Sequence, residues 1–125
     1  MSEVKYRIYG KENRIMYSWE EILNFDSLKD TLKNGGKEDQ YYSPLLQYAE
    51  VKDSQGTEIY AGDICKRTVF AFGEPRNFVG QVMMFEGCWW IDNGTAAVPL
   101  WNEMHILEIV GNIYESPELL KNITK

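Results

Sequence analysis

The chain has 125 residues, a length that suits one domain and allows a hydrophobic core without disulfides or metals. Its hydrophobic content of 44% and aromatic content of 14% exclude a disordered chain, because disordered segments lack the large apolar side chains that offset chain entropy. The formal net charge is −6, from 13 basic and 19 acidic residues with no basic run, which disfavours general binding to a nucleic-acid backbone.

The N-terminal segment predicts a β-hairpin. Val4, Tyr6 and Ile8 alternate with polar residues, which is the period of a strand with one apolar face. Residues 10–13 form a polar turn, and residues 14–17 continue as a short second strand.

A short helical region is expected next, over residues 19–33. Ser18 and Glu21 have the spacing of a capping box, in which each side chain satisfies a free backbone N–H at a helix start. Trp19, Ile22 and Leu23 would share one helical face.

The rest of the chain predicts short strands separated by turn residues. The expected strands cover residues 42–51, 57–60, 64–72, 78–85, 88–91, 97–100 and 105–114. The Asp53–Gly56 turn and the Gly62–Asp63 corner separate the first three, and residues 73–75 end the third. Pro99 marks an edge strand, since proline cannot donate to a strand ladder. Ser116 and Pro117 begin a short C-terminal helix.

Strands at roughly ten-residue spacing indicate a mainly β fold, either a small SH3-like β-barrel or a meander, with an N-terminal hairpin and a short helical region. We expect a single domain over residues 1–125. The polar residues 35–40 are the candidate hinge, which would divide an N-terminal lobe (1–40) from a β-barrel-like part (41–120).

Two segments and the opening hairpin resemble those of a known family. The residues concerned are Leu46-Gln47-Tyr48, Lys52-Asp53, Gly56, Glu58-Ile59-Tyr60, Gly62-Asp63-Ile64, residues 109–120, and Tyr6-Arg7, Lys11-Glu12-Asn13 and Met16-Tyr17 near the N-terminus. In this order they resemble the YopX family, which phages and prophages of bacteria encode. The resemblance implies a β-rich, oligomer-forming protein with no established biochemical activity, and it supplies no catalytic residues to carry over.

Cys65, Cys88 and His105 are the residues best suited to transition-metal or nucleophilic chemistry. They lack the paired short spacing of zinc ligands, and a Cys–His nucleophile would need a positioned base and an oxyanion site as well. No apolar signal segment begins the chain, which favours a reducing, cytoplasmic location and free thiols. A disulfide between the two cysteines is the alternative.

The carboxylates Asp53, Glu58 and Asp63 are the candidates for a metal site. Hard cations need several oxygens that converge on one point, whereas aspartates at turns usually accept hydrogen bonds from nearby backbone. We therefore expect no metal, no cofactor and no enzymatic activity.

The aromatic residues around Trp89 and Trp90 are the candidate interaction surface. Adjacent strand residues point to opposite faces, so one indole should enter the core and the other should face a partner or a second subunit. Phe85 and Trp101 would extend this surface.

The sequence thus predicts a phage-derived accessory protein that self-assembles and binds an unidentified protein partner. The alternative is a nucleic-acid-associated module of phage replication or regulation, in which exposed aromatics near Arg67 or Arg76 stack on single strands. No run of about 20 apolar residues could span a bilayer, so no membrane association is expected.

Overall fold

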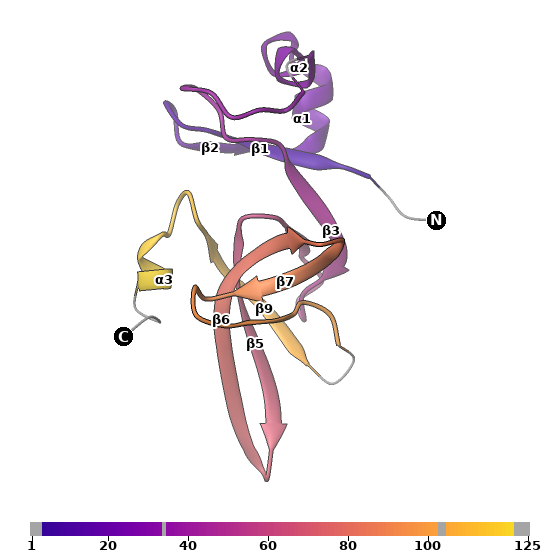
Figure 1. Cartoon of the computed structure of the whole chain (residues 1–125). Helices are drawn as coiled ribbons and strands as arrows, with labels where there is room; N and C mark the ends of the chain where they lie inside the picture. The colour runs from indigo at the N-terminus through magenta and orange to yellow at the C-terminus, as the bar shows by residue number, and fades with distance from the viewer. Residues whose placement is uncertain (1–3, 34, 103–104, 122–125) are drawn as a thin grey trace. The chain divides into compact units, whose positions relative to one another are not determined.

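The computed structural model describes residues 4–33, 35–102 and 105–121. These residues are mainly β, as predicted, and form nine strands and three short helices (Figure 1). The strands are β1 (Tyr6–Gly10), β2 (Ile15–Tyr17), β3 (Leu46–Lys52), β4 (Glu58–Tyr60), β5 (Asp63–Ala71), β6 (Glu74–Phe85), β7 (Cys88–Asp92), β8 (Ala97–Pro99) and β9 (Ile106–Asn112). The helices are α1 (Trp19–Asn24), α2 (Asp26–Lys33) and α3 (Glu118–Lys121), and none in the described part of the chain is long and apolar enough to cross a membrane.

The chain divides into two compact units, Met1–Tyr48 and Ala49–Lys125. The boundary lies inside β3, whereas the sequence suggested a division at residues 35–40. A backbone hydrogen bond holds that polar segment within the first unit: the Leu45 N–H donates to the Gly36 carbonyl oxygen at 3.0 Å.

The first unit combines the predicted hairpin with the two helices. β1 pairs antiparallel with β2 and also with the first residues of β3, where Arg7 lies opposite Leu46. The capping box is present: the Ser18 Oγ accepts from the Glu21 N–H at 3.2 Å, and the Glu21 Oε1 accepts from the Ser18 N–H at 3.0 Å. Ile8, Ile22 and Leu28 form the buried core of this unit.

β3 begins four residues later than the sequence predicted, at Leu46 instead of residue 42. The preceding residues are held in a loop by side chains rather than by a strand ladder. The Asp39 carboxylate accepts hydrogen bonds from the Tyr41 and Tyr42 N–H groups, and the Ser43 hydroxyl accepts one from the Tyr9 N–H.

The second unit is built on a curved five-stranded antiparallel sheet in the order β8-β7-β6-β5-β9. β8 is an edge strand, as Pro99 predicted. One face of this sheet, together with residues of β3 and β4, forms the core of Ala49, Ile59, Cys65, Val82, Ile91, Leu100 and Leu107. We call this the inner face and the opposite side the outer face.

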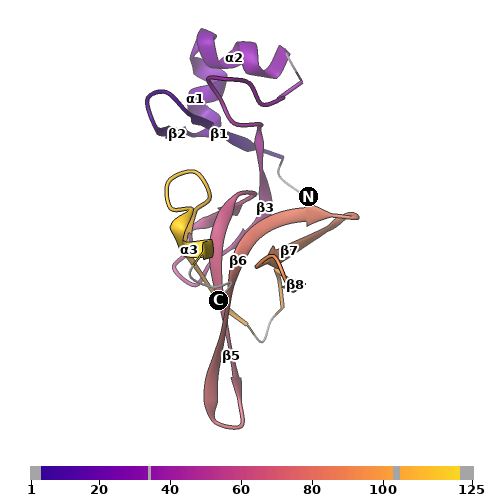
Figure 2. The same cartoon turned by 60° about the vertical axis from the view of Figure 1, so that its left-hand side comes forward.

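The β5–β6 hairpin is longer than the sequence predicted and projects well beyond the other strands of its unit (Figures 1 and 2). The third strand does end before residue 73, but the next begins at Glu74 instead of residue 78, because the turn uses only Phe72 and Gly73, with φ of 55° and 80°. Pro75 lies in β6, where the described pairing is with β5 alone, and proline is tolerated at such a free edge.

Candidate interaction surface

Trp89 and Trp90 lie on opposite faces of the five-stranded sheet, as their adjacency in β7 requires. Trp89 packs against the buried core on the inner face, opposite Met84 of β6. Trp90 lies opposite Met83 and faces outward. The two indoles therefore serve different purposes, and only Trp90 contributes to an exposed site on the outer face.

The outer face carries an open apolar hollow with a volume of about 430 Å³. We call it the aromatic hollow, and its lining residues are Met83, Phe85, Trp90, Asp92 and Ala97. Phe85 is 58% exposed, and the Trp90 Nε1–H donates to the Phe85 carbonyl oxygen at 3.2 Å. Since a cavity of about 150 Å³ holds a benzene molecule, this hollow has room for more than one aromatic ring.

α3 covers a neighbouring part of the outer face. A Cβ atom added to Gly111 would lie only 2.9 Å from the Leu119 Cδ1, so the helix rests directly on β9 at this point. α3 also contacts β6, the strand that supplies Met83 and Phe85. The outer face is thus closed by the chain's own helix in one part and open at the aromatic hollow in another.

Trp101 lies outside the aromatic hollow. It is 62% exposed and lines a separate hollow of about 260 Å³ together with Asp53, Asn102 and His105. The His105 Nδ1 is buried without a hydrogen-bond partner among the described residues, and burial, reinforced by Arg67, lowers its pKa. Of the four candidate aromatics, the structure brings Phe85 and Trp90 together at the aromatic hollow. Trp89 is the indole on the core side, and Trp101 lines the separate hollow.

The turn carboxylates Asp53 and Asp63 accept backbone hydrogen bonds. The Asp53 Oδ1 accepts from the Gln55 and Thr57 N–H groups at 2.9 Å each, and its Oδ2 accepts from the Ile109 N–H at 3.1 Å. Burial acts to raise the pKa of Asp53, but these three hydrogen bonds outweigh it and hold the pKa below the ordinary value.

Asp63 plays a similar part at the Gly62–Asp63 corner. It is buried, and its Oδ2 accepts from the Tyr60 N–H at 2.8 Å. Within the part of the chain that the structure describes, no three His, Cys, Asp or Glu side chains are grouped as metal ligands.

Cys65 and Cys88 are free thiols, so the disulfide alternative is not realised. They lie in β5 and β7, which β6 separates in the sheet. Cys65 is fully buried, and burial together with the charge of Asp63 raises its pKa to about 12. Cys88 is exposed.

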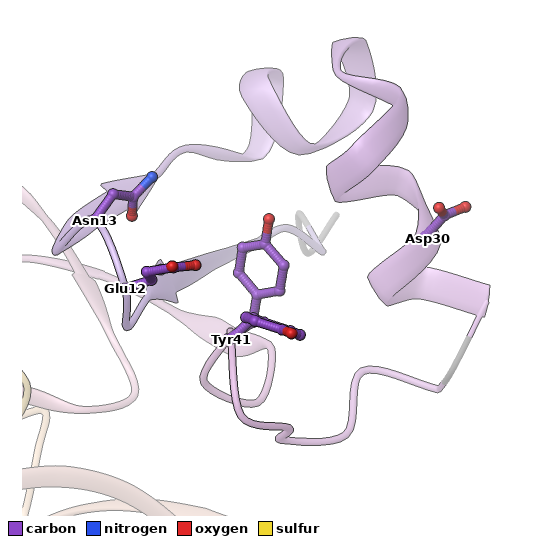
Figure 3. A pocket seen from close by; sticks show the side chains of 6 residues that line it. Glu12, Asn13, Asp30 and Tyr41 are labelled. Carbon is purple, nitrogen blue, oxygen red and sulfur yellow. The ribbon is translucent and has the colours of Figure 1, made fainter.

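The first unit has a polar hollow of about 370 Å³ that the sequence did not suggest (Figure 3). Its lining residues are Gly10, Glu12, Asn13, Asp30, Tyr41 and Tyr42. Figure 3 shows Glu12 and Asn13 in the β1–β2 turn and the Tyr41 ring between that turn and α2. Burial, followed by the charges of Tyr17 and Asp39, raises the pKa of Tyr42.

Comparison with known proteins identifies the family. The family model described as "YopX protein" matches residues 5–121. No curated protein matches the chain. Among solved structures, protein EF1440 from Enterococcus faecalis has a similar fold, with a TM-score of 0.59 and 17% identity over 96% of this chain and 99% of that chain. Because the family match covers nearly the whole chain, the protein belongs to the YopX family.

Proposed function

We propose that this chain is a phage-type accessory protein without enzymatic activity, which self-assembles and binds a protein partner through the aromatic hollow. The observation that carries the proposal is the open hollow at Met83, Phe85 and Trp90, on the face of the sheet that lies away from the core. Exposed apolar hollows with aromatic walls are typical of protein interfaces, where aromatic side chains supply much of the binding energy.

The reactive side chains support a role other than catalysis. The Cys65 thiol is buried and its pKa is about 12, so the thiolate that a nucleophile needs is scarce at neutral pH. Asp53 and Asp63 are engaged by backbone N–H groups that shape turns. These groups act in the fold, whereas the aromatic hollow has no evident purpose within a single chain.

The chemistry of the hollow indicates what it would bind. Its walls are apolar except for Asp92, so the ligand would be an apolar or aromatic protein segment. Residues 77–120 include six carboxylic residues and no lysine or arginine, which favours a ligand with basic residues next to its apolar part.

Sedimentation velocity of the purified chain over a range of concentrations tests this proposal. The wild type should form assemblies, and Phe85→Thr should shift the equilibrium toward the monomer because it removes an aromatic wall. Met84→Thr is the matched control, since Met84 directly precedes Phe85 in β6, is 42% exposed and lies opposite Trp89 on the inner face. A wild type that remains monomeric, or an assembly that Phe85→Thr leaves intact, would contradict the proposal.

A nucleic-acid-associated role is the second candidate. The β5–β6 hairpin favours it, because Phe70 and Phe72 share this hairpin with Arg67 and Arg76, and aromatic and basic side chains together bind single strands. Fluorescence anisotropy with labelled oligo(dT) and oligo(U) at low salt tests this role. Binding that Arg76→Gln weakens would support it, and the absence of binding at low salt would exclude it.

A further inference from the structure

We infer that the aromatic hollow of one copy of this chain receives the tip of the β5–β6 hairpin from a second copy. The inference rests on the proposed function and names the segment that fills the hollow. The tip comprises Phe70, Phe72 and Gly73, and its two phenyl rings are 66% and 100% exposed.

Local structure does not account for a phenylalanine at position 72. Phe72 and Gly73 form a two-residue turn with φ of 55° and 80°, a geometry for which Asn-Gly is the favoured sequence. The left-handed conformation is unfavourable for a bulky residue, and full exposure of the ring adds a second unfavourable contribution. Glu86 and Gly87 form a comparable turn, with φ of 51° and 79°, and place a polar residue at the equivalent position. An interaction outside the single chain would account for the ring of Phe72.

The tip and the hollow of one chain lie too far apart to meet. Phe72 precedes β6 and Phe85 ends it, 13 residues later. At the rise of a strand this separation is on the order of 40 Å. β5 and β6 pair continuously from Ile64 opposite Gln81 to Ala71 opposite Glu74, so the hairpin cannot fold back on its own unit. If a hairpin tip enters the hollow, it must therefore come from another copy of the chain.

The two surfaces match in size. The hollow of about 430 Å³ exceeds the space that one phenyl ring requires, so it can take Phe72 and part of Phe70. Trp90 and Phe85 would then contact the incoming rings, in the aromatic pairing that proteins favour at interface centres.

The charges of the two surfaces also match. Arg76 lies on the projecting hairpin and is exposed, whereas Asp92 lines the hollow and Glu86 directly follows the lining residue Phe85 in the chain. Lys66 is paired with Glu108 at 3.3 Å, and the Arg67 guanidinium lies over the Phe78 ring at 5.9 Å. Arg76 is therefore the hairpin cation best placed to meet the carboxylates of a second copy. Docking would bring opposite charges together at the rim of an apolar contact.

Such a contact joins two different surfaces, the tip of one copy and the hollow of another. Each chain would offer one tip and one hollow, so two copies could exchange tips in a closed dimer, or successive copies could join head to tail in a ring or filament. This property allows a mixing experiment that a contact between two hollows or between two tips would not pass.

The experiment uses two full-length variants. Phe72→Asn removes the ring from the tip and supplies the residue that the turn prefers, so this variant should fold at least as well as the wild type. Phe85→Thr alters the hollow and leaves the tip intact. Each variant alone should self-associate about tenfold or more weakly than the wild type, as expected for the loss of one aromatic contact at an interface centre. An equimolar mixture should form one-to-one dimers, because the intact hollow of Phe72→Asn accepts the intact tip of Phe85→Thr.

Sedimentation velocity and native mass spectrometry of the separate and mixed variants read out the result. Trp101→Thr is the control, since Trp101 is exposed but lies outside the aromatic hollow, and it should assemble like the wild type. If Phe72→Asn assembles normally while Phe85→Thr does not, the hollow binds another segment, so this inference fails and the proposed function survives. If Phe85→Thr assembles normally, both fail. If the mixture stays monomeric, the tip does not dock in the hollow.

Discussion

Trp89 and Trp90 are neighbours in one strand but lie on opposite faces of the sheet. Trp89 packs on the buried core, and Trp90 lines the aromatic hollow on the outer face. Their partners in β6 also lie on opposite faces, with Met84 opposite Trp89 and Met83 opposite Trp90. A single segment of β7 therefore links the stability of the second unit to the shape of its exposed surface.

This relationship predicts different effects for the two tryptophans. Trp89→Ala should lower the free energy of unfolding by about 1–3 kcal/mol, because it removes a partly buried ring from the core side. Trp90→Ala should cost less stability and should weaken self-association more. Denaturant unfolding and sedimentation velocity of both variants measure the two effects, and a larger loss of stability in Trp90→Ala would contradict the placement of the indoles.

Asp53 should stabilise the protein in a pH-dependent way. Its three backbone hydrogen bonds hold its pKa in the folded protein below the ordinary value of 3.8. The stabilisation is therefore present above this pH and is lost as the pH falls through the lower folded-state pKa. Asp53→Asn should cost about 1–3 kcal/mol at neutral pH, because an amide cannot accept all three hydrogen bonds.

Urea unfolding at several pH values checks this prediction. The difference between wild type and Asp53→Asn should be largest at neutral pH and should shrink below pH 4. Glu74→Gln changes an exposed carboxylate and is the control, with little expected effect. A constant difference at every pH would mean that the carboxylate charge has no part in the turn.

The two cysteines should differ sharply in reactivity. Cys88 is exposed and should react with a thiol reagent at pH 8, whereas buried Cys65, with a pKa of about 12, should react only after unfolding. One thiol per folded chain and two per unfolded chain are expected, and Cys88→Ser should leave none in the folded protein. Rapid titration of both thiols would show that Cys65 is accessible.

The same burial predicts a loss of stability in alkali. Because the folded-state pKa of Cys65 is raised from 9.0 to about 12, the protonated thiol stabilises the fold fully below pH 9 and progressively less as the pH rises toward 12. Cys65→Ala should reduce this alkaline dependence, as thermal unfolding between pH 8 and pH 10.5 would show.

Gly80 should be intolerant of a side chain. A Cβ atom there would lie 2.6 Å from the carbonyl oxygen of Asp92, which is backbone of the neighbouring strand β7 and can yield only if the strand moves. Gly80→Ala should therefore cost about 1–3 kcal/mol. Gly111→Ala should cost less, because its Cβ would meet side-chain atoms of Leu119 and Ser116 near the C-terminal helix. Chemical denaturation of both variants compares these costs.

The sequence could predict much of the fold because local signals agree with it. The capping box of Ser18 and Glu21 marks a real helix start, and Pro99 marks a real edge strand. The errors lie where long-range contacts override a local signal. Pro75 suggested a strand end, but it sits in an extended hairpin at a point where the described pairing leaves one side of β6 free.

The candidate site was only partly predictable, for a physical reason. Alternation in a strand shows that Trp89 and Trp90 face opposite ways, but it does not say which indole meets the core. That choice depends on the curvature of the sheet and on α3, which covers one part of the outer face and leaves the hollow open. The separation of Trp101 from Phe85 likewise depends on the loop after β8, where no alternation of apolar and polar residues indicates which way a side chain points.

We expect the aromatic hollow to act as a protein-binding surface. Hydroxyl-radical footprinting of the wild type at low and high protein concentration tests it most directly, since Met83 and Met84 are adjacent but lie on opposite faces of β6. We expect oxidation of Met83, Phe85 and Trp90 to slow as the chain assembles, while oxidation of Met84 stays unchanged. Assembly that leaves the oxidation rates of Met83 and Trp90 unaltered would contradict the claim.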